Sequence, residues 1–144
     1  MSRIALFNLT IGFWTLFLAA ACGAFLATDL TATYIAEKSI SQTWSSVLLS
    51  SAHGHSNLFG LLHIVFGLTL PYSRIADRFK VLQTAGLVCG VVAMGPGMFL
   101  RSLKAPGNDS DPLGLILGAL LSAALISLFS HAAALTSRCV ERKI

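Results

Sequence analysis

The stretch SAHGHSNLFGLLHIVFGLTLP, residues 51–71, is apolar for most of its length and yet contains three histidines, His53, His55 and His63. No Asp, Glu, Lys or Arg occurs from residue 39 to residue 73. A helix needs about 20 apolar residues to cross the hydrocarbon of a bilayer. The sequence therefore predicts a transmembrane helix over about residues 47–71, with titratable rings in an environment where such groups are rare and costly.

Three further runs without charged residues have a similar length, at residues 4–28, 81–100 and 112–137. The chain of 144 residues is 55% hydrophobic and only 11% charged, which is outside the usual balance of a soluble domain. The predicted fold is an all-α integral membrane protein, with four transmembrane helices in an antiparallel bundle. Residues 1–144 are expected to form a single transmembrane domain.

The formal net charge of +4 is explained by the distribution of basic residues between the two ends of such a bundle. Seven basic residues lie at one end and three at the other. The seven are Arg3, Arg74, Arg78, Lys80, Arg138, Arg142 and Lys143, and the three are Lys38, Arg101 and Lys104. By the positive-inside rule, both termini and the middle loop are cytoplasmic. The charge thus orients a multi-pass inner-membrane protein, and nothing else indicates a nucleic-acid partner.

Residues 30–46 connect the first two runs and allow two interpretations. Tyr34 and Trp44 favour the headgroup level of a bilayer. A short interfacial helix on the outer side is one possibility, and a polar loop anchored by the same two aromatic residues is the other. Further along, Gly95-Pro96-Gly97 is expected to kink or end the third helix, because proline lacks a backbone donor.

Small residues and cysteines give weaker signals. Glycines four residues apart, Gly86 with Gly90 and Gly114 with Gly118, allow helix backbones to approach closely in lipid. They indicate tight packing within the bundle or contacts with other subunits or copies. Cys22, Cys89 and Cys139 form no Cys-x-x-Cys pair, so a disulfide framework or zinc site is not predicted. We interpret them as small packing residues.

On an unbroken helix the three histidines do not share one face. His53, together with Ser56, Gly60 and Gly67, lies within about 80° of His63, whereas His55 lies about 80° away on the other side. His53 and His55 can share a site only if the helix is distorted at Gly54. The stripe of small residues forms a groove between imidazoles. Either a neighbouring helix fills it, with the histidines hydrogen-bonded across the interface, or it holds a haem or a metal ion.

Depth in the membrane suggests a second pairing of histidines. From the outer ends of their helices, His63 lies roughly 24 Å deep and His131 roughly 28 Å deep, at 1.5 Å per residue. These two rings could therefore face each other as axial ligands near the cytoplasmic side. His53 lies only roughly 9 Å deep and has no histidine at its own depth.

The pattern His53-x-His55-x-Asn57-Leu58-x-Gly60 resembles small four-span bacterial membrane proteins that are themselves similar to subunit I of the haem-copper oxidases. Ala52-His53-Gly54 at the start of a helix that ends in Pro71 resembles the second helix of that subunit. The resemblance covers about 20 residues. It implies that His53 is an axial haem ligand, with His55, Asn57 and His63 in supporting roles. Nothing in the sequence matches the oxygen-reducing centre of that family.

Three functions follow from these observations. The first is a small protein of the bacterial inner membrane that binds haem b, through His53, His63, His131, His55 and Asn57, or a metal ion such as copper, through His53, His55 and His63. It would transfer electrons, as a subunit of a larger complex. The second is a non-catalytic structural or assembly subunit with packing histidines. The third is a proton or small-solute pathway. No catalytic motif is visible, so we do not expect an enzyme acting on its own.

Overall fold

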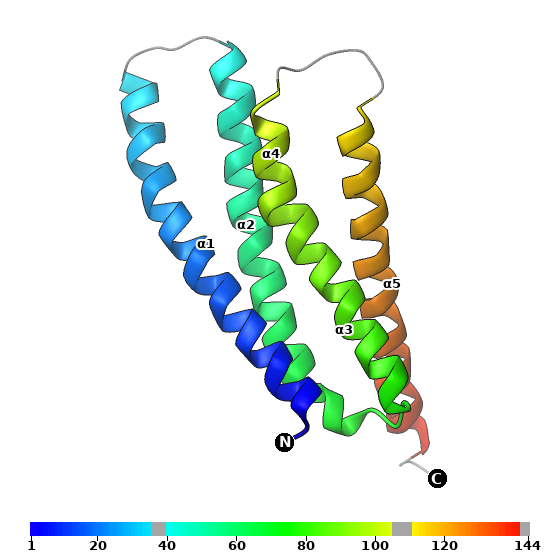
Figure 1. Cartoon of the computed structure of the whole chain (residues 1–144). Coiled ribbons are helices and arrows are strands. Elements are labelled where there is room, and N and C mark those ends of the chain that lie inside the picture. Colours follow the sequence, from blue (N-terminus) through cyan, green and yellow to red (C-terminus); the bar gives the residue numbers. More distant parts are fainter. Residues whose placement is uncertain (36–39, 105–110, 142–144) are drawn as a thin grey trace.

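The computed structural model describes residues 1–35, 40–104 and 111–141, and the side chains of residues 1–28, 44–104 and 111–140. All elements within these ranges are helical. Successive columns of the bundle alternate in direction, so that the first and the last helix have their chain ends at the same end of the bundle (Figure 1). They are α1 (Arg3–Ile35), α2 (Ile40–Thr69), the short 3-10 helix η1 (Leu70–Tyr72), α3 (Asp77–Val92), the π-helical turn η2 (Ala93–Gly97), α4 (Met98–Ser102) and α5 (Pro112–Glu141).

The bundle consists of two helical hairpins. Helix α1 packs along α2, and α3 packs along α5, while α2 meets η2 and α4 between the hairpins. Figure 1 shows α1 and α5 as the outer columns. The hydrophobic core lies between α2, α3 and α5 and consists of Phe59, Phe66, Leu70, Leu87 and Ala124. The antiparallel helical bundle predicted from the sequence is therefore observed.

Within the described residues, three helical segments are long and apolar enough to cross a membrane: Arg3–Thr28, Asp77–Ser102 and Pro112–Val140. Helix α2 is not among them, because its histidines, Asn57 and serines dilute its apolar side chains. Large apolar side chains cover the outside of the bundle. Phe13 on α1, for example, is 61% exposed and Phe129 on α5 is 76% exposed. Such a surface is compatible with lipid contact.

The third helical column departs from regular α-helix at the predicted position but does not end there. Residues 93–97 form a single π-helical turn that contains Pro96, and α4 then continues to Ser102. Proline cannot donate the backbone hydrogen bond of a regular helix, and a wider turn accommodates that loss. Gly97 leaves space for Leu117 of α5, whose side chain occupies the position where a Cβ would be.

The expectation of a separate interfacial helix over residues 30–46 is corrected by the structure. Residues 30–35 continue α1, and residues 40–46 form the first turns of α2, while residues 36–39 lie outside the described part. No glycine or proline occurs between Gly23 and Gly54. Nothing in the local sequence therefore stops α1 at the membrane surface or delays the start of α2.

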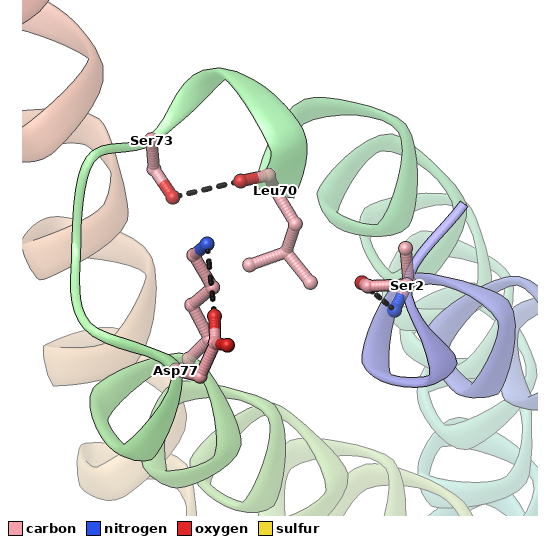
Figure 2. Close-up of polar contacts among 6 residues, drawn as sticks. Ser2, Leu70, Ser73 and Asp77 are labelled. Atoms are coloured by element: carbon pink, nitrogen blue, oxygen red, sulfur yellow. Dashed lines mark hydrogen bonds and ion pairs between the residues drawn. The ribbon is translucent and has the colours of Figure 1, made fainter.

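The middle loop is a tight turn at the end of the bundle where both termini lie. The hydroxyl of Ser73 donates to the carbonyl of Leu70 at 2.9 Å (Figure 2). The Ser73 backbone N–H donates to the same oxygen at 3.2 Å. Pro71 lies inside η1 and fixes the backbone there. Helix α3 then begins at Asp77, whose carboxylate pairs with Lys80 at 3.2 Å. Residues 73–76 thus form a short connection between η1 and α3.

Candidate functional site

Helix α1 fills the groove of small residues that the sequence predicts on α2. A Cβ atom added at Gly12 of α1 would lie 2.7 Å from the carbonyl oxygen of Gly60. A Cβ at Gly67 would lie 2.8 Å from the carbonyl oxygen of Ala5. Both distances are shorter than real Cβ contacts, so the two backbones touch only because glycine occupies these positions. Of the two occupants considered for the groove, the neighbouring helix is the one observed.

His53 connects α2 to α1 through its ring. Its Nδ1 lies 2.8 Å from the carbonyl oxygen of Ala19, and its Nε2 lies 3.2 Å from the side-chain nitrogen of Asn57. A carbonyl only accepts, so Nδ1 carries the hydrogen and Nε2 accepts from the amide. The ring lies directly against Gly23, where a Cβ would be 2.8 Å from Nδ1. Both ring nitrogens of His53 therefore have protein partners.

His55 lies on a different face and is exposed. Its Nδ1 is 2.8 Å from the carbonyl oxygen of Ser51, one turn earlier on the same helix. Helix α2 continues without a break through Gly54, so His53 and His55 do not converge. Within the described residues there is no group of three His, Cys, Asp or Glu side chains that could hold a metal ion. The predicted metal set of His53, His55 and His63 is not brought together.

His63 is fully buried and belongs to a polar network that joins three helices. Its Nδ1 lies 2.8 Å from Oδ1 of Asn8 in α1. The side-chain nitrogen of Asn8 donates to the carbonyl of Ile4 at 2.9 Å and to the hydroxyl of Thr84 in α3 at 2.8 Å. Asn8 is also completely buried. This network is the most deeply buried polar contact between α1, α2 and α3 in the described residues.

The network fixes the orientation of Asn8 and the tautomer of His63. The Ile4 carbonyl only accepts, so the amide nitrogen of Asn8 must face it and Oδ1 must face the imidazole. Nδ1 of His63 is then the donor, and Nε2 of the neutral ring has a lone pair. This buried Nε2 has no hydrogen-bond partner. One buried acceptor thus lacks a donor.

His131 connects α5 to α2 at a different face of α2. Its Nε2 lies 2.8 Å from the hydroxyl of Thr69, and its ring packs on Phe66 with the centroids 4.2 Å apart. The Thr69 hydroxyl donates to the carbonyl of Val65, so Nε2 of His131 is the donor and Nδ1 is left without a partner. Thr69 is about 120° around α2 from His63. The two imidazoles predicted to face each other are therefore held on separate faces.

Several polar residues of these interfaces were not singled out from the sequence. They are Asn8, Thr69, Thr84 and Gln83, whose amide nitrogen donates to Ser130 of α5 at 2.7 Å. Asn8 gives the clearest signal, since it is an amide inside an otherwise apolar run. The interpretation of the cysteines as packing residues is corrected in part, because Cys22 and Cys139 are exposed and only Cys89 is half-buried.

Comparisons with known proteins add no relative: no family model, no curated protein and no solved structure matches the chain. The resemblance of the histidine-bearing stretch to haem-copper oxidase subunit I therefore stays a prediction. Functional inference has to rest on the geometry of the described residues.

Proposed function

We propose that this chain spans the bacterial inner membrane four times, with both termini in the cytoplasm. The membrane-crossing length of α1, α3–α4 and α5 supports this topology. Helix α2 is the least apolar column, and several of its polar groups have partners inside the protein, although Nε1 of Trp44 and Nε2 of His63 have none. His53 bonds to α1, and His63 bonds to Asn8. A buried polar group with a partner costs far less in hydrocarbon than an unpaired one.

Within that membrane protein, the histidines serve as tethers between helices, and the chain is a non-catalytic subunit of a larger membrane complex. The observation that carries this proposal is the glycine contact between α1 and α2, at Gly12, Gly60 and Gly67. The groove beside the histidines contains a helix, and the N–H of each inward-facing ring donates to a protein oxygen. Close backbone packing and interhelical hydrogen bonds are what hold helices together in lipid.

Gly118, one residue of the second glycine pair, identifies the part of the surface available to a partner, whereas a Cβ at Gly114 would lie 3.0 Å from the carboxylate of Asp111. Gly86 and Gly90 are used inside the bundle, where side chains of Ser127 and Phe59 occupy the positions of their missing Cβ atoms. Gly118 on α5 has nothing within 4 Å of that position. Ser122, one turn later, is exposed and bonds only to its own helix. This outward strip on α5 is the expected contact with another subunit.

The test is a bulky substitution that the isolated chain tolerates. Gly118→Leu is expected to dissociate the complex isolated from native membranes in a mild detergent, as measured by native gel electrophoresis and light scattering. Gly54→Leu is the matched control, since Gly54 on α2 also has nothing within 4 Å of its Cβ position. Unchanged particle mass with Gly118→Leu, or equal loss with both variants, would contradict the proposed role of α5.

A second candidate, electron transfer at a haem or metal centre, is favoured by one observation. Nε2 of His63 and Nδ1 of His131 are buried lone pairs without donors, and each ring donates its other N–H to a protein oxygen. That arrangement is typical of ligating histidines. His53, the ligand implied by the resemblance, does not fit, because Asn57 occupies its second nitrogen. An absorption spectrum and metal analysis of the purified protein test whether a haem or metal is bound. A colourless, metal-free preparation would exclude this candidate.

A further inference from the structure

Basic residues gather at the end of the bundle where both termini and the middle loop lie. Arg3 begins α1, Arg78 lies in the first turn of α3, and Arg138 lies in the last turn of α5; Figure 1 shows these helix ends at the same end of the bundle. Arg3 and Arg78 are exposed. In the sequence this end has seven basic residues and two acidic ones, Asp77 and Glu141. The surface has an excess of positive charge.

Arg3 and Arg78 form no ion pair with an acidic side chain in the described part of the chain. Asp77, the acidic side chain described at this end, is paired with Lys80 at 3.2 Å (Figure 2). Its carboxylate therefore already neutralises a basic residue. Two arginines lie against aromatic rings instead of against acids. The guanidinium of Arg78 is 4.9 Å from the ring centre of Phe79, and that of Arg138 is 5.9 Å from the ring centre of Tyr72. Cation–π contact orients an arginine but leaves its charge available to an anion.

The same surface continues directly into an apolar one. Tyr72 is 60% exposed and Phe79 is 48% exposed, and after Lys80 the exposed side chains of α3 become aliphatic, with Val81 at 53% and Leu82 at 68%. Aromatic side chains of this kind lie at the level of lipid headgroups. The combination of arginine, aromatic ring and aliphatic surface matches the sequence of phosphate, glycerol and acyl chain in a phospholipid.

We propose that this basic and aromatic end binds the headgroup of an anionic phospholipid of the inner leaflet. The lipid phosphate is recognised by Arg3 and Arg78, and its acyl chains lie along Val81 and Leu82 of α3. A soluble acidic protein or a nucleic acid would leave this aliphatic surface without a partner. The proposal rests on the membrane insertion proposed above, since it requires these residues to lie at the bilayer surface.

The test compares lipids retained by the full chain after extraction from vesicles that contain equal parts of phosphatidylglycerol and phosphatidylcholine. Native mass spectrometry should show preferential retention of phosphatidylglycerol. Each basic residue at an anionic surface contributes about 1 kcal/mol, or about a fivefold change in affinity. The double variant Arg3→Gln, Arg78→Gln should therefore lose about 25-fold in preference for the anionic lipid. Lys104→Gln, which removes an exposed charge from the opposite end, should leave the preference unchanged.

Equal retention of the two lipids by the wild type would overturn the proposal, as would an equal loss in the double variant and in Lys104→Gln. Loss of a bound acidic protein from the double variant, with lipid retention unchanged, would also overturn it. Alkaline carbonate extraction tests the underlying assumption separately. Release of the wild-type chain into the supernatant would overturn the membrane insertion, whereas altered lipid retention by an inserted chain bears only on the lipid site.

Discussion

The contact between Asn8 and His63 offers a direct test of the tether interpretation, because both side chains are fully buried and lie on different helices. In Asn8→Leu, the Nδ1–H of His63 loses its acceptor. A buried donor without a partner costs about 1–3 kcal/mol, although interhelical hydrogen bonds in membranes average only about 0.6 kcal/mol and reach about 1.7 kcal/mol. We expect Asn8→Leu to reduce the free energy of unfolding by about 2 kcal/mol.

The double variant Asn8→Leu, His63→Leu separates a hydrogen bond from mere loss of packing. Replacing both partners of a buried hydrogen bond by apolar side chains is nearly neutral, since neither is left unsatisfied. His63→Leu alone leaves Oδ1 of Asn8 without its donor and is expected to cost about 1 kcal/mol or more. The double variant should therefore be about 1–2 kcal/mol more stable than the sum of the single effects predicts.

The measurement is reversible unfolding of the purified chain in mixed micelles with increasing mole fraction of sodium dodecyl sulfate, followed by far-ultraviolet circular dichroism. Thr10→Leu with His55→Leu serves as the matched control cycle. Both of these residues bond to their own helices, at Leu6 and Ser51, and no contact joins them. Their effects should add. Additivity to within about 0.3 kcal/mol in the Asn8–His63 cycle as well would refute the reasoning.

Two further predictions concern the other histidines and are measured by the same unfolding assay. Gly23→Ala should push the His53 ring off α1 and cost about 1–2 kcal/mol through the lost hydrogen bond and packing. Gly54→Ala, with open space around it, should be neutral or stabilise α2 by up to about 1 kcal/mol. Equal effects of the two substitutions would contradict the close approach of α1. Thr69→Val should cost about 1 kcal/mol by removing the acceptor for His131, and an unchanged stability would show that this bond is absent in the membrane.

The helical architecture could be predicted because the signal is local. Each charge-free run in the sequence corresponds to one passage of the chain through the bundle, and the basic residues of the middle loop mark the turn. Boundaries were less predictable where stop signals are missing. Residues 30–35 and 40–46 contain polar and aromatic side chains typical of a surface segment, but without glycine or proline the first stretch continues α1 and the second begins α2. Helix propensity there outweighed the change in polarity.

Only the part of the candidate site that belongs to α2 could be predicted from the sequence. Helical periodicity correctly placed His53, His63 and the small residues on one stripe, since angular position depends only on spacing along one helix. The occupant of the stripe depends on another helix. Gly12 and Gly23 are eleven residues apart in an apolar run, and no sequence pattern links them to Gly60 or His53. The distinction between a cofactor groove and a helix interface is made by tertiary packing.

The polar content of α2 and the glycines of α1 therefore have one physical explanation. A helix with several imidazoles and an amide is poorly soluble in lipid unless those groups find partners before they meet hydrocarbon. Helix α1 supplies the acceptors, at the Ala19 carbonyl and at Asn8, and its glycines bring them within hydrogen-bonding distance. His55, which faces outward, bonds to its own helix instead. The α1–α2 hairpin is thus the unit in which the unusual composition of α2 becomes compatible with a membrane, and its histidines are intelligible only together with the helix that precedes them.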